Sequence, residues 1–69
     1  MEDQFVVTLN DNFICITPDY NEAKEFYDKQ IENWKEYYKD KPIDKNDKLV
    51  LKNYSTEQIL YQFRTLDLL

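Results

Sequence analysis

The side chains of this 69-residue chain that could carry chemistry are one cysteine, fourteen carboxylates and six tyrosines. Histidine, the usual general base near neutral pH, does not occur. Cys15 lies within an apolar run and has no neighbouring Lys or Arg in sequence that would lower the pKa of its thiol. Glycine is also absent, which excludes the glycine-rich loops that bind phosphates. These features predict a protein that is not an enzyme and that uses no cofactor.

A short polar segment that contains Asp44, Asn46 and Asp47 raises the question of a calcium loop. Such a loop needs a glycine at its turn and a bidentate glutamate at its end. Here lysines separate the oxygen ligands, glycine is missing, and Glu57 lies too far along the chain. We therefore expect a solvated connection and no metal site.

Acidic side chains recur along the longest periodic segment, residues 17–40, at steps of four: Asp28, Glu32, Glu36 and Asp40, with Glu22 and Glu25 extending the same side. Like charges at this spacing destabilise an isolated helix by about 0.2–0.5 kcal/mol per pair. Three lysines in the same segment partly offset this repulsion, and Glu25 and Lys29 have a favourable spacing for an ion pair. Two interpretations remain open: a solvated outer face, or a negative strip that engages a basic protein surface.

Two tyrosines lie outside the expected core. Tyr37 is at the border of the apolar stripe of the helix, and Tyr61 falls on the far side of an expected second helix. Tyrosine is enriched at protein interfaces, where one end of the ring is apolar and the other is wet. The residues predicted to bind a partner are therefore these: Glu25, Asp28, Glu32, Glu36, Tyr37, Asp40 and Tyr61.

A helix over about residues 17–40 is needed to position this acidic side. On its other side, apolar residues recur at steps of three and four, as expected for a core face: Tyr20, Ala23, Tyr27, Ile31, Trp34 and Tyr38. Two starts fit the sequence. Thr17 could be the N-cap before Pro18, or Asp19 could be the N-cap, with Glu22 completing a capping box. Pro42 should end the helix.

Residues 4–9 and 13–16 are predicted to form a β-hairpin, since both are β-branched and aromatic runs around Asn-Asp-Asn. A turn at Asp11 and Asn12 would direct five side chains toward the helix: Phe5, Val7, Leu9, Ile14 and Ile16. The opposite face would then carry Val6, Thr8, Phe13 and Cys15. That face is unusually apolar, so we expect another element or another molecule to cover it.

The C-terminal third predicts a third strand near residues 49–52 and a second helix from Ser55. Ser55 and Gln58 fit a capping box, and Tyr54 with Ile59 fits a hydrophobic staple. Ile59, Leu60, Phe63 and Leu66 would form the apolar side, and the leucine-rich tail, residues 66–69, should be docked. The prediction is a single α+β domain over residues 1–69, with a ββαβα order: an antiparallel hairpin and a third strand packed on one long helix, then a short C-terminal helix.

Charge and composition limit the environment and the partners. The net charge of −5 disfavours binding to nucleic acids and to anionic membranes. A single cysteine fits a reducing compartment, and the sequence has neither a secretory signal pattern nor an apolar run long enough to span a bilayer. We therefore expect a cytoplasmic protein with no direct nucleic-acid or membrane contact.

In size, acidity and lack of a catalytic motif, the chain resembles the small inhibitors that bacteriophages and mobile elements encode. This resemblance and the acidic helix side imply a non-catalytic protein-binding module that engages a basic surface of a host protein, such as a surface that binds nucleic acid. The alternative is a structural or regulatory homo-oligomer assembled through the open sheet face and aromatic residues.

Overall fold

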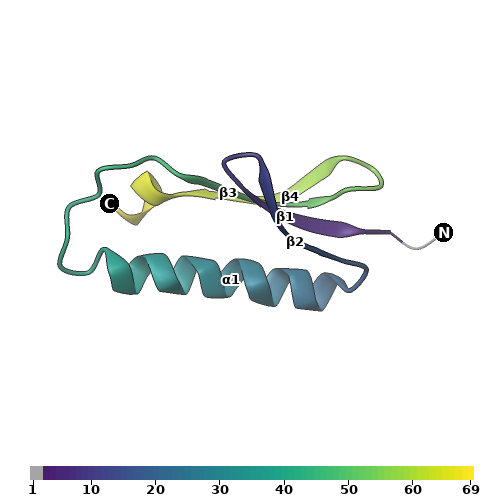
Figure 1. Ribbon diagram of the computed structural model, residues 1–69, viewed down its shortest axis with the longest axis horizontal. Coiled ribbons are helices and arrows are strands. Elements are labelled where there is room, and N and C mark those ends of the chain that lie inside the picture. The colour runs from purple at the N-terminus through teal and green to yellow at the C-terminus, as the bar shows by residue number, and fades with distance from the viewer. Residues whose placement is uncertain (1–2) are drawn as a thin grey trace.

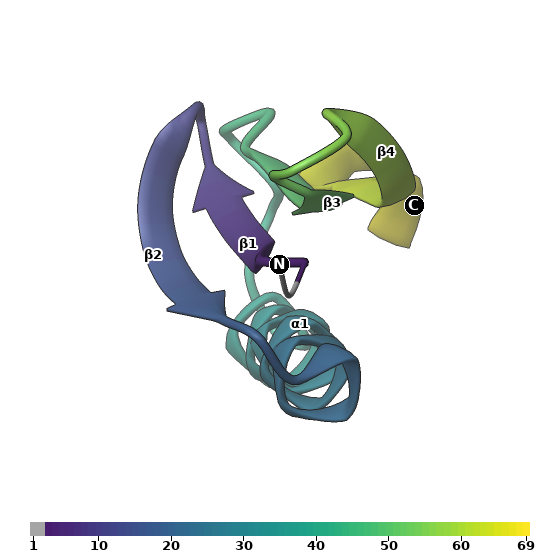
Figure 2. The ribbon, with the colours of Figure 1, turned by 90° about the vertical axis from the view of Figure 1, so that its right-hand side faces the viewer.

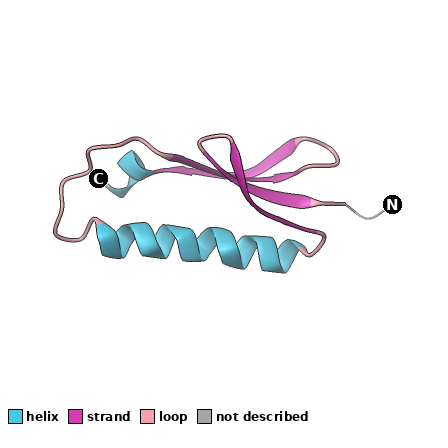
Figure 3. Cartoon of the chain, viewed as in Figure 1, coloured by secondary structure: helices cyan, strands magenta, loops and turns pink. Residues whose placement is uncertain are grey.

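A computed structural model describes residues 3–69 as a four-stranded antiparallel sheet with one long helix along one face (Figures 1 and 3). The elements in chain order are β1 (Phe5–Leu9), β2 (Asn12–Thr17), α1 (Tyr20–Tyr37), β3 (Lys48–Asn53), β4 (Gln58–Arg64) and a short 3-10 helix, η1 (Thr65–Leu68). The strand order is β2-β1-β3-β4, so β2 and β4 form the edges. The α+β class is confirmed, but the predicted ββαβα order is wrong.

Helix α1 begins where Asp19 caps it. The Asp19 carboxylate accepts hydrogen bonds from the amides of Asn21 (2.9 Å) and Glu22 (3.4 Å), which satisfies two donors that lack partners inside the helix. Of the two predicted starts, the one at Asp19 is confirmed. The amide of Asp19 donates to the Thr17 hydroxyl (3.1 Å), so Thr17 takes the place that Glu22 would have in a capping box.

The predicted core stripe of α1 is confirmed, although the helix is shorter than expected. Ala23, Tyr27 and Trp34 are buried against the centre of the sheet, where Val7, Leu49 and Leu51 are fully buried; Tyr20, Ile31 and Tyr38 pack at the margin of this cluster. Burial of each large apolar side chain contributes about 1.5–3 kcal/mol. The helix ends at Tyr37, ahead of Pro42, so Asp40 lies beyond it.

The hairpin turn lies one residue earlier than predicted. Asn10 and Asp11 have positive φ angles of 51° and 69° and connect Leu9 to Asn12. Moving the turn by one residue shifts the pairing by two residues and keeps Phe13 on the open face. The β-bulge in β2 between Phe13 and Cys15 adds a shift of one residue, which exchanges the faces of the residues that follow it. Ile14 and Ile16 are therefore 37% and 55% exposed and do not face the helix as predicted.

Cys15 changes face as well. It pairs with Val7 on the side of the sheet that packs on α1, whereas the sequence placed it on the open face. Burial, and next the carboxylate of Glu22, raise the pKa of the Cys15 thiol, so the thiolate is disfavoured.

Residues Gln58–Arg64 form strand β4 where the sequence predicted a second helix. The Asn53 side chain accepts hydrogen bonds from the amides of Ser55 (3.0 Å) and Thr56 (3.2 Å), and Glu57 has a φ of 61°. These contacts make a turn in place of the predicted capping box. Phe63 therefore reaches the core from a strand, and its ring stacks on Trp34 at 6.2 Å.

The open face of the sheet is partly covered by the chain itself. Val6 and Val50 are buried there (0% and 6% exposed), and the ring of Phe13 in β2 meets the ring of Tyr54 edge-on at 5.5 Å. Tyr54 follows β3, so this contact connects the edge strand β2 with the turn between β3 and β4. Figure 2 shows the curvature of the sheet that these strands form. The predicted apolar open face therefore exists, but with Ile16 in place of Cys15.

The C-terminal tail is docked through η1. Thr65 is fully buried and its amide donates to the carbonyl of Asp47 (3.0 Å), while Leu68 packs at the margin of the core. Leu66 and Leu69 are 43% and 89% exposed, so the docking predicted for residues 66–69 is confirmed only for Leu68. No helix within residues 3–69 has the length and apolar character required to cross a membrane.

Candidate protein-binding surface

The acidic face consists of Glu25, Asp28, Glu32 and Glu36 on α1 together with Asp40 just beyond its end. All five residues are exposed. The side chains of Asp28 and Glu32 are 55% and 71% exposed. The core stripe occupies the opposite side of α1, so the helix presents its carboxylates to solvent while its aromatic side holds the fold.

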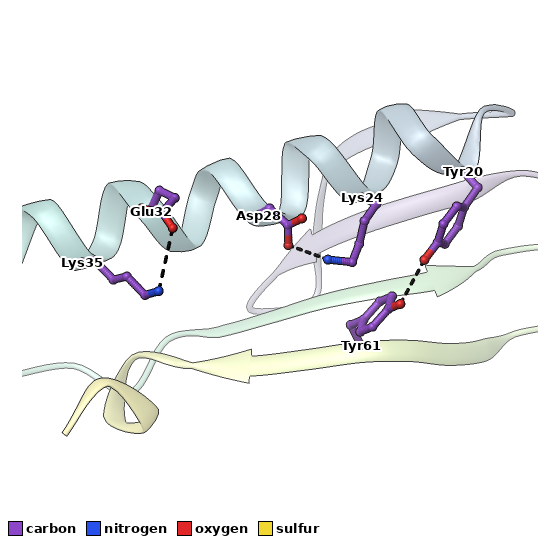
Figure 4. Close-up of polar contacts among 6 residues, drawn as sticks. All are labelled: Tyr20, Lys24, Asp28, Glu32, Lys35 and Tyr61. Carbon is purple, nitrogen blue, oxygen red and sulfur yellow. Dashed lines mark hydrogen bonds and ion pairs between the residues drawn. The ribbon is translucent and has the colours of Figure 1, made fainter.

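Two lysines of the chain reduce the charge of the acidic face (Figure 4). Lys24 Nζ lies 2.6 Å from Asp28 Oδ1, and Lys35 Nζ lies 3.8 Å from Glu32 Oε1. Exposed pairs of this kind contribute only about 0–1 kcal/mol and leave their carboxylates accessible.

The other three carboxylates of the acidic face are not paired in this way. Within residues 3–69, Glu25, Glu36 and Asp40 have no cationic nitrogen within 4.0 Å, and the predicted pair of Glu25 with Lys29 is not formed. The acidic face therefore keeps a negative charge that the described part of the chain does not neutralise.

Tyr61 lies on β4 and points toward α1, so its predicted place on the far side of a helix is wrong (Figure 4). Its hydroxyl and that of Tyr20 are hydrogen-bonded at 3.0 Å, and this bond is the main reason that the pKa of Tyr20 is raised. The Tyr61 ring lies 5.8 Å from the ring of Tyr27 and 4.7 Å from Lys24 Nζ. Tyr61 remains 40% exposed, at the edge of the core.

Tyr37 lies at the C-terminal end of α1 and is 57% exposed. Its ring meets that of Tyr38 edge-on at 4.8 Å, and Lys41 Nζ lies 4.2 Å from its centroid. The ring face of Tyr37 therefore already accepts a cation from this chain.

An open cleft of about 430 Å³ adjoins Tyr37; we call it the aromatic cleft, and it is lined by Asn33, Trp34, Tyr37, Tyr38, Asp44, Lys45 and Asp47. Burial, followed by the carboxylates of Asp44 and Asp47, raises the pKa of the Tyr38 phenol. Rings and carboxylates thus share one concave surface, which suits a cationic side chain.

Sequence reasoning missed the aromatic cleft. The sequence predicts Tyr38 in the core stripe and Asp44 in a solvated connection. The two residues come together because residues 38–47 pass across the end of the helix (Figure 1). In the same segment, Asp47 Oδ1 accepts a hydrogen bond from the Asn10 side chain (3.0 Å). No group of three or more His, Cys, Asp or Glu side chains in the described chain is arranged to hold a metal ion.

Comparisons with protein-family models, with curated proteins and with solved structures found no match to this chain. The chemistry of the surface must therefore be taken from its own side chains. These are carboxylates along α1 and, at its C-terminal end, aromatic rings beside carboxylates. Such a surface complements a protein surface that presents lysine and arginine.

Proposed function

We propose that this protein is a non-catalytic binding module whose acidic face engages a basic surface of a partner protein. The observation that carries this proposal is the separation of the two sides of α1. Its aromatic side is buried in the core, and its carboxylates project into solvent at a spacing that costs helix stability. A costly arrangement that the fold does not use is expected to serve an interaction.

The dimensions of α1 define the surface that it would fit. Eighteen residues at 1.5 Å per residue make a rod about 27 Å long. Charge complementarity along such a rod accelerates association and sets the orientation more than it adds affinity. Exposed aromatic anchors supply much of the affinity of most interfaces, and Tyr37 stands at one end of the acidic face.

The kind of partner follows from this shape. A basic groove that accepts a negatively charged rod is the kind of surface that DNA-processing proteins use for nucleic acid. Occupation of such a groove would inhibit the partner, as phage-type inhibitors do. The exposed carboxylates and the ring of Tyr37 support such binding.

The test compares two variants with the same change in charge, Glu36→Lys on the acidic face and Glu57→Lys in the turn before β4. The first probe is an immobilised arginine-rich peptide, and the second is the protein captured by the wild type from lysate of its host. Glu36→Lys should weaken both interactions about tenfold, and the difference from wild type should shrink as salt is raised. Glu57→Lys should change them by less than about twofold.

Circular dichroism provides the control, because both positions are exposed and both variants should keep the wild-type helix content. Equal effects of the two variants would mean that only net charge matters. That result, or unchanged binding by Glu36→Lys, would reject the acidic face as the binding surface.

A further inference from the structure

We infer that β2 pairs with β2 of a second copy of this chain, so that two four-stranded sheets join into one across a two-fold axis. The surface involved is the edge of β2 and the side of α1 beside it. It is separate from most of the acidic face, so the inference does not depend on the function proposed above.

The two edges of the sheet differ in how they are protected. Natural edge strands avoid unwanted pairing through charged residues, proline or a covering element. β4 carries Arg64 and two glutamines, and Tyr61 ties it to α1. β2, with the sequence NFICIT, carries no charge and no proline. Its one protective feature is the β-bulge between Phe13 and Cys15, which leaves the exposed edge around Ile16 open to pairing.

The backbone of β2 has hydrogen-bonding groups available on its outer side. The amide of Asn10 donates to the carbonyl of Lys48 (2.9 Å), and this bond fixes which residues of β1 face β3. The N–H and C=O groups of successive residues point to opposite edges of a strand. Asn10 bonds toward β3, so Val7, three residues earlier, points its N–H and C=O toward β2, where its partner is Cys15. Ile16, the next residue, then directs its N–H and C=O away from the sheet.

The side of α1 that borders β2 is also left open. A shallow groove of about 220 Å³ lies between the two elements and is lined by Cys15, Glu22, Glu25, Phe26 and Lys29. Phe26 is 39% exposed and is the apolar centre of this groove. When β2 extends into a second sheet, the two helices come to lie antiparallel on the same face.

Charge complementarity identifies a second copy as the occupant. Glu22 lies on one side of Phe26 along α1 and Lys29 lies on the other. A two-fold axis near Phe26 reverses the helix and brings Lys29 of each copy toward Glu22 of the other, twice in one interface. Glu25 lines the same groove beside Phe26 and meets its own copy near the axis, so the two Lys29–Glu22 pairs must outweigh one contact between like charges.

Size and net charge set the expected strength. A standard interface buries about 800 Å² per partner, about a sixth of the 4958 Å² exposed by the described chain. Each copy carries a net charge of −5, and repulsion between charges farther apart than about 8 Å is largely screened at physiological salt. We expect a reversible dimer that forms in the micromolar range at that salt concentration.

The first experiment substitutes one isoleucine on each edge. Ile16 in β2 and Ile59 in β4 belong to one row across the open face, and they are 55% and 56% exposed. Sedimentation velocity is recorded for wild type, Ile16→Lys and Ile59→Lys from low to high micromolar concentration. Wild type and Ile59→Lys should dimerise alike, and Ile16→Lys should dissociate at least about tenfold more readily.

Three results of this experiment would contradict the β2–β2 dimer. A wild type that stays monomeric throughout would overturn the inference. Equal weakening by both substitutions would overturn it in favour of pairing through the open sheet face. Equal dimerisation of all three proteins would overturn it too.

The second experiment tests the two-fold geometry through charge. Lys29→Glu places like charges opposite each other and should weaken the dimer about tenfold. The double variant Glu22→Lys, Lys29→Glu restores opposite charges and should return the dissociation constant to within about twofold of wild type. A double variant no better than Lys29→Glu would exclude this arrangement of the helices. Glu36→Lys, far from the axis, should leave dimerisation unchanged.

Discussion

The two flanks of α1 are built differently. Toward β4, the helix is joined to the edge strand by the Tyr20–Tyr61 hydrogen bond and by the stacking of Trp34 on Phe63. We call this side the closed flank. Toward β2 the helix offers Phe26 beside a shallow groove, and we call this side the open flank. The same helix thus meets one edge of the sheet with a continuous aromatic contact and the other without one.

This difference teaches where the chain places its stability and where it leaves room for association. A chain of 69 residues buries a modest fraction of its surface, so it depends on large aromatic contacts. These contacts are concentrated on the closed flank. A partner could bind and leave the open flank with little change in the stability of the fold, which is what a reversible interface requires.

The largest expected effect comes from truncating one aromatic residue on each flank. Trp34 is 8% exposed and stacks on Phe63, so Trp34→Ala should lower the free energy of unfolding by about 3–5 kcal/mol. Phe26→Ala, on the open flank, should lower it by less than about 1 kcal/mol. Urea denaturation at submicromolar concentration, below the range in which the proposed dimer forms, measures both values.

Where Trp34→Ala fails to fold, Trp34→Phe gives a smaller loss that can still be compared with Phe26→Ala. Equal losses at the two positions would show that the flanks do not differ in stability. The comparison would then have to be abandoned.

The next effect is a dependence on alkaline pH that arises on the closed flank. Burial, with smaller contributions from the carboxylates of Asp28 and Asp67, raises the pKa of Tyr27 from 10.0 to about 12. The folded protein therefore favours the neutral phenol. Stability from this group is complete below pH 10 and is lost as the pH rises toward about 12.

The expected loss over this pH range is on the order of 2 kcal/mol for Tyr27 alone. Urea denaturation across the range should show a smaller fall for Tyr27→Phe than for wild type, since phenylalanine does not titrate. Identical profiles would mean that Tyr27 is not protected by burial. Phe26, on the open flank, has no hydroxyl to ionise, so its packing adds no dependence of stability on pH.

The long helix was predictable because its signals agree with one another. Asp19, the apolar period and Pro42 all favour a helix in the same place, and packing against the sheet adds to that preference. The hairpin was predictable in outline only. Three consecutive turn-forming residues allow two positions of the turn, and neither position predicts the β-bulge between Phe13 and Cys15, which brings Cys15 and not Ile16 to the helix side.

The C-terminal strand was missed because a local signal competed with a non-local one. Ser55 and Gln58 fit a capping box, but β3 needs a neighbour on its free side, and Tyr61 and Phe63 alternate with the period of a strand. The side-chain cap from Asn53 then makes a turn out of the same residues. That alternation is the feature of the sequence that indicates β4.

The candidate site divides in the same way. The four carboxylates of the acidic face on α1 follow from helix spacing, so their exposure was predictable from the sequence, whereas Asp40 lies beyond the end of the helix. The aromatic cleft and the position of Tyr61 depend on contacts between segments far apart in the chain. No local pattern contains that information.

The smallest expected effect comes from replacing one lysine on each flank. Lys24, on the closed flank, lies 2.6 Å from Asp28 and 4.7 Å from the centroid of the Tyr61 ring, while Lys29 borders the open groove. Because the Lys24 side chain is 30% exposed, its ion pair is screened, and Lys24→Met should cost only about 0.5–1 kcal/mol.

Lys29→Met should fall within about 0.5 kcal/mol of wild type, because Lys29 forms no ion pair within residues 3–69. Both values come from urea denaturation at submicromolar concentration, below the range in which the proposed dimer forms. The cost of Lys24→Met should decrease in an Asp28→Asn background, because the ion pair is already absent there and only the contact with the ring remains. An unchanged cost in that background would assign the whole effect to Tyr61. A larger cost at Lys29 than at Lys24 would reverse the assignment of the two flanks, since it would place a stabilising contact where the groove is open.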